Sequence, residues 1–140
     1  MKFKNILIGI VIIIIDQLSK NLIIDKNISI ISKFLEFNYT QNTGGAFEVG
    51  KINYIIIISI FIIIGIIAFL IIENKKITNY ISFIILLSGS ISNLIDRIFR
   101  GFVIDFIDIN LFNFPNFNIA DICIILGVIF IVIGEARSFK

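Results

Sequence analysis

Four aspartates are concentrated between residues 88 and 123, and they have the most distinctive chemistry in the chain: Asp96, Asp105, Asp108 and Asp121. Two carboxylates held close together cannot both ionise, so one of them keeps a proton. Such a pair can activate a water molecule and protonate a leaving group, which is the chemistry of an aspartic protease. A magnesium site is a weaker alternative, because such sites usually also hold substrate phosphates.

The spacing of these aspartates does not decide which two of them form a pair. Asp121 stands at the start of an expected helix, and either Asp105 or Asp108 could approach it from the preceding segment. Asp96 has two arginines at neighbouring helical positions, which favours a structural ion pair for it. The residues alone therefore leave two candidate pairs open.

The amino-acid composition excludes several other mechanisms. The chain of 140 residues contains no histidine, which excludes Ser-His-Asp and Cys-His triads and HExxH zinc sites. Its single cysteine, Cys123, cannot form an intrachain disulfide, and we interpret it as a buried, inert thiol. The net charge of +2 is too small to indicate a nucleic-acid partner.

The segments on both sides of the aspartates are apolar enough to cross a membrane. Hydrophobic residues make up 58% of the chain and the mean hydropathy is +1.05, whereas a soluble domain is roughly half apolar. We expect a mainly α-helical membrane protein with a single domain at residues 1–140 and four spans, at about 3–24, 52–72, 77–98 and 119–134. The first run is assigned to a span because no signal-peptide cleavage site of small residues follows it.

The segment at residues 25–51, between the first two spans, is more polar and is expected to form a small β-like unit outside the membrane. Residues 28–39 roughly alternate apolar and polar side chains, which is typical of a short strand pair. Asn42 and the glycines at 44 and 45 can adopt positive φ. They indicate either a plain turn or a loop whose backbone amides approach a ligand, and both interpretations stay open.

Polar residues on three of the expected helices share faces or ends. Asp16 and Lys20 are one helical turn apart and predict an ion pair near the membrane surface. This pair could either only make the two charges tolerable there or also orient other polar groups. Asn118 can cap the fourth helix with Asp121 in its first turn, so capping alone could explain both residues. One stripe runs along the end of the third span and comprises Gly89, Asn93, Asp96, Arg97 and Arg100.

The distribution of basic residues predicts the orientation of the four spans. With both termini and the 73–76 turn on one side, that side carries mostly lysine and arginine in short segments. The positive-inside rule then places the termini in the cytoplasm. The aspartates of the 88–123 stretch are therefore expected near the outer face of the membrane.

Five short motifs, in order along nearly the whole chain, resemble those of the bacterial lipoprotein signal peptidases, also called signal peptidase II, the A8 family of membrane aspartic proteases. They are DQLSK at residues 16–20, NTGGAF at 42–47, SGSISNLIDR at 88–97, VIDF at 103–106 and FNIAD at 117–121. Each motif is modest alone, whereas five in order between four spans are highly specific.

This resemblance implies a function and a role for individual residues. Members of the family cut the signal peptide from prolipoproteins just before a diacylglyceryl-modified cysteine, without a metal or other cofactor. The catalytic pair implied here is Asp105 and Asp121. Residues implied to contact the substrate or the pair are Asn42, Gly44, Asn93, Arg97 and Asn118, and those implied to stabilise the site are Asp16, Lys20 and Asp96. The implied partners are a lipid-modified prolipoprotein and membrane lipids, and the implied location is the bacterial cytoplasmic membrane, with the protein as a monomer.

The third span departs from the family pattern at two positions. Ser88 and Ser92 stand where the family usually has glycine. Serine is still small, so close packing between helices is expected to be kept.

Two functions of other classes compete with a protease. A transporter or proton-relay subunit would carry acids deep inside its spans, and a non-enzymatic membrane partner would use every acid as a surface anchor. The acids cluster at one membrane boundary and the second span is uncharged. This distribution favours the enzyme.

Overall fold

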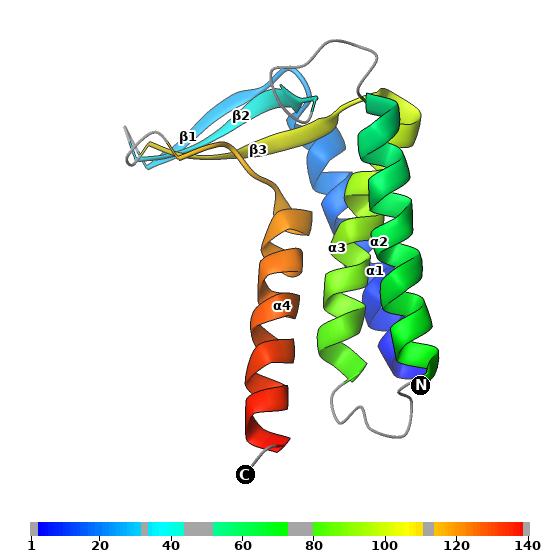
Figure 1. The fold of residues 1–140 in the computed structure, drawn as a ribbon. Coiled ribbons are helices and arrows are strands. Elements are labelled where there is room, and N and C mark those ends of the chain that lie inside the picture. Colours follow the sequence, from blue (N-terminus) through cyan, green and yellow to red (C-terminus); the bar gives the residue numbers. More distant parts are fainter. Residues whose placement is uncertain (1–2, 32–33, 44–51, 73–79, 111–113, 139–140) are drawn as a thin grey trace.

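The computed structural model describes residues 3–31, 34–43, 52–72, 80–110 and 114–138. The elements in these ranges are α1 (Phe3–Ile23), β1 (Asn27–Ile31), β2 (Leu35–Asn42), α2 (Ile52–Ile72), α3 (Tyr80–Arg100), β3 (Val103–Ile109) and α4 (Ile119–Ser138). The helices run along one another and the sheet lies across one end of them, while α1 begins and α4 ends at the opposite end (Figure 1). The predicted mainly helical fold with a small β unit is therefore confirmed.

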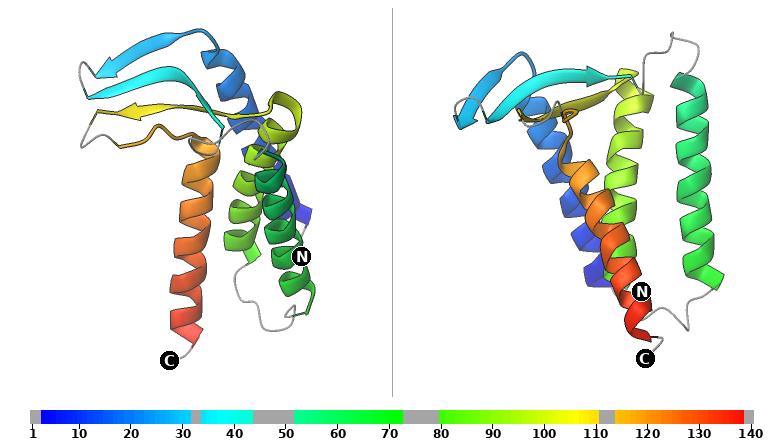
Figure 2. Two further views of the ribbon diagram at one scale, coloured as in Figure 1. Left: turned by 45° about the horizontal axis from the view of Figure 1, so that its top comes forward. Right: turned by 60° about the vertical axis from the view of Figure 1, so that its left-hand side comes forward.

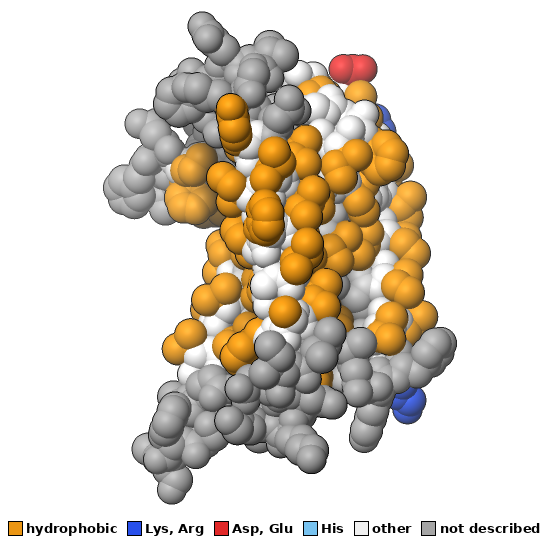
Figure 3. All heavy atoms as spheres, turned by 45° about the vertical axis from the view of Figure 1, so that its right-hand side comes forward, with side chains coloured by type: hydrophobic (Ala, Val, Ile, Leu, Met, Phe, Trp, Pro, Cys, Tyr) orange, Lys and Arg blue, Asp and Glu red, His pale blue; other side chains and the backbone are white. Residues whose placement is uncertain are grey.

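The outer surfaces of the helices are apolar, as contact with lipid requires. Within the described ranges, Lys4–Ile23 and Tyr80–Arg100 are long and apolar enough to cross a membrane by length and composition, and Tyr54–Leu70 and Ile119–Gly134 are shorter apolar helices. Isoleucine, leucine, valine and phenylalanine side chains stay exposed along α1, α2 and α4. Apolar side chains cover most of the described part of the face drawn in Figure 3. So large an exposed apolar surface marks a surface that contacts a membrane or a partner.

Helix α3 lies at the centre and packs against the other three helices. Most of its buried residues are small or polar rather than large and apolar. A Cβ added to Gly89 would meet the backbone carbonyl oxygen of Ala120 in α4, and one added to Gly127 would lie 2.7 Å from the backbone nitrogen of Leu86. The first of these close approaches holds the first turn of α4 against the polar part of α3, and the second continues the helix contact farther from the sheet.

The sheet is antiparallel with the strand order β1-β2-β3. The predicted strand pair is present as β1 and β2, whereas the third strand, β3, was not predicted. The register places Asn42 opposite Val103 and Thr40 opposite Asp105, so the end of β2 lies beside the first half of β3. Gly101, with a φ of 80°, makes the turn that leads from α3 into β3.

Three of the predicted helix boundaries are shifted. Helix α1 ends at Ile23 rather than at residue 24, α3 continues to Arg100 rather than 98, and α4 continues to Ser138 rather than 134. Arg97 and Arg100 fall in the last turn of α3, where cations favour the helix dipole and extend the helix. Helix α2 covers 52–72 as predicted, and residues 77–79 of the predicted third span lie outside the described residues.

Candidate active site

Asp105 and Asp121 come from different elements that meet where the helices reach the sheet. Asp105 lies in β3 and is 2% exposed, and Asp121 lies in the first turn of α4. Asn118 joins them, because its Nδ2 donates to Asp105 Oδ1 at 2.6 Å and its backbone nitrogen donates to Asp121 Oδ2 at 3.1 Å. Asn118 Oδ1 also accepts from the backbone nitrogen of Asp121 at 2.9 Å, so the predicted helix cap is confirmed. The cap that begins α4 therefore also holds the two carboxylates in one site.

A further asparagine contacts each aspartate. Asn42 Nδ2 donates to Asp105 Oδ2, and Asn93 Nδ2 donates to Asp121 Oδ1, each over 2.7 Å. Each of the four carboxylate oxygens thus accepts an N–H from an uncharged group. These bonds orient the carboxylates but add no positive charge, so they do not themselves relieve the repulsion within the pair, which a shared proton would reduce.

The surroundings of Asp105 favour its protonated form. Burial raises the pKa of Asp105 above its usual value, and the negative charge of Asp121 raises this pKa further. The hydrogen bonds from Asn42 and Asn118 and the positive charge of Lys20 act in the opposite direction, because they stabilise the ionised carboxylate. The net shift of the pKa is upward.

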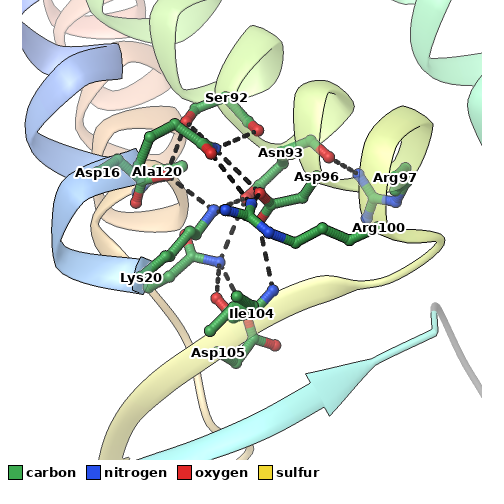
Figure 4. Close-up of polar contacts among 12 residues, drawn as sticks. Asp16, Lys20, Ser92, Asn93, Asp96, Arg97, Arg100, Ile104, Asp105 and Ala120 are labelled. Atoms are coloured by element: carbon green, nitrogen blue, oxygen red, sulfur yellow. Dashed lines mark hydrogen bonds and ion pairs between the residues drawn. The ribbon is translucent and has the colours of Figure 1, made fainter. Parts of the chain in front are cut away.

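Next to this pair lies a charged cluster, formed by the buried Asp16, Lys20 and Asp96 and the partly exposed Arg100 (Figure 4). Lys20 Nζ is 2.7 Å from Asp16 Oδ2 and 2.9 Å from Asp96 Oδ2, and all three side chains are fully buried. Arg100 pairs with Asp96 from the next turn of α3. The two negative and two positive charges balance, as buried ions require. The predicted Asp16–Lys20 ion pair is confirmed, as is the pairing of Asp96 with one of its neighbouring arginines.

Lys20 connects the charged cluster to the aspartate pair through Asn93. Its ammonium donates to Asn93 Oδ1 at 2.9 Å, and Asn118 Nδ2 approaches the same oxygen at 3.2 Å. Because donors occupy this oxygen, the amide must turn its Nδ2 toward Asp121. The buried ammonium thereby fixes the direction in which Asn93 faces.

Two residues of this network, Gln17 and Ser92, were not predicted. Ser92 Oγ donates to Asp16 Oδ2 at 2.7 Å, and Gln17 Nε2 donates to Ser92 Oγ and to Asp96 Oδ1, each at 3.0 Å. The prediction treated Ser92 only as a small residue for helix packing, and its hydroxyl is in addition a donor to a buried carboxylate. The available signal was that both residues directly adjoin predicted site residues. Ser88, by contrast, donates to the carbonyl of Ile84 in its own helix, at 2.6 Å.

Two cavities border the aspartate pair, one among the helices and one beside the sheet. The helix cavity has a volume of about 190 Å³, and Asn93, Arg97 and Asp121 form part of its wall. The sheet cavity has a volume of about 550 Å³, and Asn42 and Asp105 form part of its wall. Each carboxylate of the pair therefore borders a space that a ligand could enter.

The remaining predicted site residues have different outcomes. Arg97 lies at the helix cavity, with Nη1 3.5 Å from the carbonyl oxygen of Asn93. Asp108 is three residues from Asp105 in the same strand, so its side chain points to the other face of the sheet, where Asp108 Oδ2 accepts from Asn38 Nδ2 at 3.0 Å. Gly44 lies outside the described residues. Of the two pairs that the spacing left open, the structure brings together the one made by Asp105.

Apolar helices that surround a buried polar centre, with two carboxylates where the helices meet a small sheet, define a membrane enzyme of mainly helical fold. The sequence model of the family described as "Signal peptidase (SPase) II" matches residues 8–137. The chain belongs to the signal peptidase II family, which confirms the resemblance carried by its five motifs. This membership makes the chain a membrane protease.

Individual relatives and solved structures are similar over nearly the whole chain. A lipoprotein signal peptidase of Staphylococcus haemolyticus is 36% identical, covering 96% of this chain and 91% of the relative. One of Staphylococcus aureus is 37% identical, covering 96% of this chain and 88% of the relative. The structure of a bacterial membrane enzyme solved by the in meso method at 2.3 Å resolution has a TM-score of 0.82 and 33% identity, covering 98% of this chain and 90% of that one.

Proposed function

We propose that the chain is an aspartic endopeptidase that removes the signal peptide from diacylglyceryl-modified prolipoproteins and cuts just before the lipid-modified cysteine. The observation that carries this proposal is the double contact of Asn118, which bonds one oxygen of Asp105 and one oxygen of Asp121. Two carboxylates held by the uncharged groups of one residue suit a pair that shares a proton. The names of the relatives support the substrate class.

In the proposed reaction Asp105 starts protonated and Asp121 starts ionised. Asp121 takes a proton from water as the water oxygen attacks the carbonyl carbon of the scissile peptide bond. Asp105 gives its proton to the carbonyl oxygen, so a neutral tetrahedral intermediate forms. Collapse of this intermediate breaks the carbon–nitrogen bond, the leaving nitrogen receives the proton held by Asp121, and the hydroxyl proton returns to Asp105. No metal or cofactor takes part in this scheme.

The remaining site residues are proposed to hold the pair or the substrate. Asn42, Asn93 and Asn118 orient the aspartates through the bonds described above. Arg97 offers its guanidinium N–H groups at the helix cavity, where a carbonyl of the substrate would accept them. Gly44 is proposed to contact the substrate through its backbone.

The proposed placement in the membrane follows from the apolar helices and the charge distribution. All four helices cross the bacterial cytoplasmic membrane, as parts of a single domain at residues 1–140. The termini face the cytoplasm, and the sheet and aspartate pair lie near the outer face. The arrangement of the helices supports a common side for the two termini, since α1 begins and α4 ends on the side away from the sheet (Figure 1). The proposed working form is a monomer.

The test replaces each aspartate by its uncharged isostere. Asp105→Asn and Asp121→Asn are each expected to reduce cleavage of a lipidated precursor by about a thousandfold or more, because the shared proton and the base are lost. Processing is followed as the size shift of the precursor in membrane vesicles. The matched control is Asp108→Asn, the same change in the same strand but on the other face of the sheet.

Two results would contradict the proposal. One is near wild-type processing by either Asp105→Asn or Asp121→Asn. The other is an equal loss of processing in Asp108→Asn, which would show that the substitutions damage the sheet rather than a reacting pair. Thermal unfolding of the purified variants in detergent separates loss of folding from loss of chemistry.

A further inference from the structure

The helix cavity extends beyond the aspartate pair toward two hydroxyl groups, those of Ser59 and Ser90. Both line the cavity that contains Asp121, and two isoleucines, Ile62 and Ile124, complete this part of its wall. Ser90 precedes Asn93 by three residues on α3, which places it about 4.5 Å farther along the helix from the sheet. The cavity therefore runs from the carboxylates toward the hydrocarbon and carries polar groups at depth.

Ser59 is a polar residue in an otherwise apolar part of α2, so contact with lipid does not explain its side chain. Between Ile55 and Ile72, serine at 59 is the sole residue of α2 with a polar side chain. Among the described residues its hydroxyl has no hydrogen-bond partner, whereas Ser90 Oγ already donates to the backbone carbonyl of Leu86 at 2.9 Å. The Ser59 hydroxyl is thus a donor directed to a cavity, and Ser90 offers only an acceptor there.

Besides the Asp121 carboxylate, the cavity wall offers a ligand two hydrogen-bond donors. The Ser59 hydroxyl and the Arg97 guanidinium both have N–H or O–H groups to give, and the isoleucines suit an apolar body. A group that accepts hydrogen bonds and is attached to hydrocarbon matches these two donors and the isoleucines beside them. An ester carbonyl of a lipid is such a group, and a volume of about 190 Å³ holds the ester region rather than whole acyl chains.

The arrangement of α2 gives acyl chains a way out of the cavity. Helix α2 packs against α3 and stands away from α1 and α4 (Figure 2). Its side chains beyond the cavity are exposed apolar ones, including Ile58 and Phe61. Chains that leave the cavity beside α2 would therefore enter the surrounding lipid.

We infer that Ser59 is a specificity-determining residue whose hydroxyl donates a hydrogen bond to an ester carbonyl of the diacylglyceryl group on the substrate cysteine. This inference rests on the proposed function, since it names the part of the proposed substrate that the helix cavity takes. It adds a binding contact from α2, the one helix that contributes nothing to the buried network described above.

The test compares two precursors that differ only in the linkage of their lipid, one with ester-linked acyl chains and one with ether-linked alkyl chains. Cleavage is measured in detergent micelles free of phospholipid, so that the substrate supplies the only ester carbonyls. Ser59→Ala is expected to lower kcat/KM for the ester precursor by about three- to tenfold, the usual loss for one neutral hydrogen bond. The ether precursor is expected to be cleaved equally by Ser59→Ala and wild type.

Two control variants define the contact. Ser59→Thr keeps the hydroxyl and is expected to keep the preference for the ester precursor. Ser90→Ala removes a hydroxyl from the same cavity that is already bonded to its own helix, so the ester preference is expected to stay.

The inference is overturned if Ser59→Ala lowers cleavage of both precursors equally, because the hydroxyl would then serve the peptide or the fold. It is also overturned if the wild type cleaves the two precursors equally well while Ser59→Ala has no effect. Cleavage of neither precursor by the wild type would overturn the proposed function itself, and the lipid contact with it.

Discussion

Two pairs of aspartates lie next to each other in this molecule, and they differ in what stands between the carboxylates. Asp16 and Asp96 both contact the ammonium of Lys20, whereas Asp105 and Asp121 both contact uncharged groups of Asn118. A cation compensates two ionised carboxylates, and an amide does not. The first pair is therefore suited to hold helices together, and the second is suited to share and exchange a proton.

The two pairs also differ in access. Asp16, Lys20 and Asp96 are 0% exposed and their partners come from within the protein. Asp105 and Asp121 each line a cavity, one beside the sheet and one among the helices. Aspartate thus stands as an enclosed ion in one place and beside a cavity in the other.

The largest effect is expected from removing the cation of the structural pair. Lys20→Met keeps most of the side-chain volume but leaves Asp16 and Asp96 with Arg100 as the only cation of the cluster. Breaking a buried ion pair in this way costs about 3–5 kcal/mol, because an uncompensated charge remains buried. We expect loss of the folded protein, measured as thermal unfolding and as the monomer fraction in detergent.

The control for this change is Lys26→Met, which removes a lysine that is exposed just after α1. It is expected to leave stability unchanged. Asp105→Asn should in turn stop catalysis while the protein stays folded, since it removes no compensating charge. Equal unfolding midpoints for Lys20→Met and the wild type would show that the charged cluster is not a structural centre.

A smaller effect is expected from separating the helices that carry the two pairs. Gly89→Ala places a Cβ against the backbone carbonyl of Ala120, next to Asp121, and 3.0 Å from Ile124 Cγ1. Overpacking of this kind typically costs about 1–3 kcal/mol, and the shift of α4 should also lower kcat/KM.

The matched control is Gly65→Ala, where an added Cβ meets nothing within 4 Å. This change is expected to be neutral or to stabilise α2 by up to about 1 kcal/mol. Unfolding in detergent and precursor cleavage check both variants. A Gly89→Ala protein as stable and active as the control would show that the close approach of α3 and α4 can relax freely.

Local rules predicted the parts of the fold that depend on neighbours in sequence. The run of uncharged residues predicted the bounds of α2, and the positions of Asn118 and Asp121 predicted the cap of α4. The four-residue spacing of Asp16 and Lys20 predicted their ion pair. Each of these features is decided within a few residues, so composition and helical spacing suffice.

Long-range packing decided the rest. Residues 103–106 of β3 are all buried, so the strand lacks the polar–apolar alternation that reveals a half-exposed strand. Without that strand, Asp105 and Asp108 could not be distinguished, since residues three apart share a face on a helix and lie on opposite faces of a strand. The contact of Ser92 with Asp16 likewise depends on how α1 packs against α3. The choice of Asp105 from the sequence came from the family motif.

The smallest expected effect is a change in pH dependence, and it tests which member of the proposed reacting pair holds the proton. The bond from Asn42 stabilises the ionised form of Asp105, so it lowers a pKa that burial raises. Asn42→Ala should therefore raise the pKa of Asp105 further. If Asp105 must be protonated to act, activity is lost as the pH rises through this pKa, and the alkaline limb of kcat/KM against pH should move to higher pH in the variant.

Asn38→Ala removes a comparable amide of β2 that bonds Asp108 instead, and it should leave the limb in place. A limb that moves to lower pH in Asn42→Ala, or that moves equally in both variants, would assign the proton elsewhere than on Asp105.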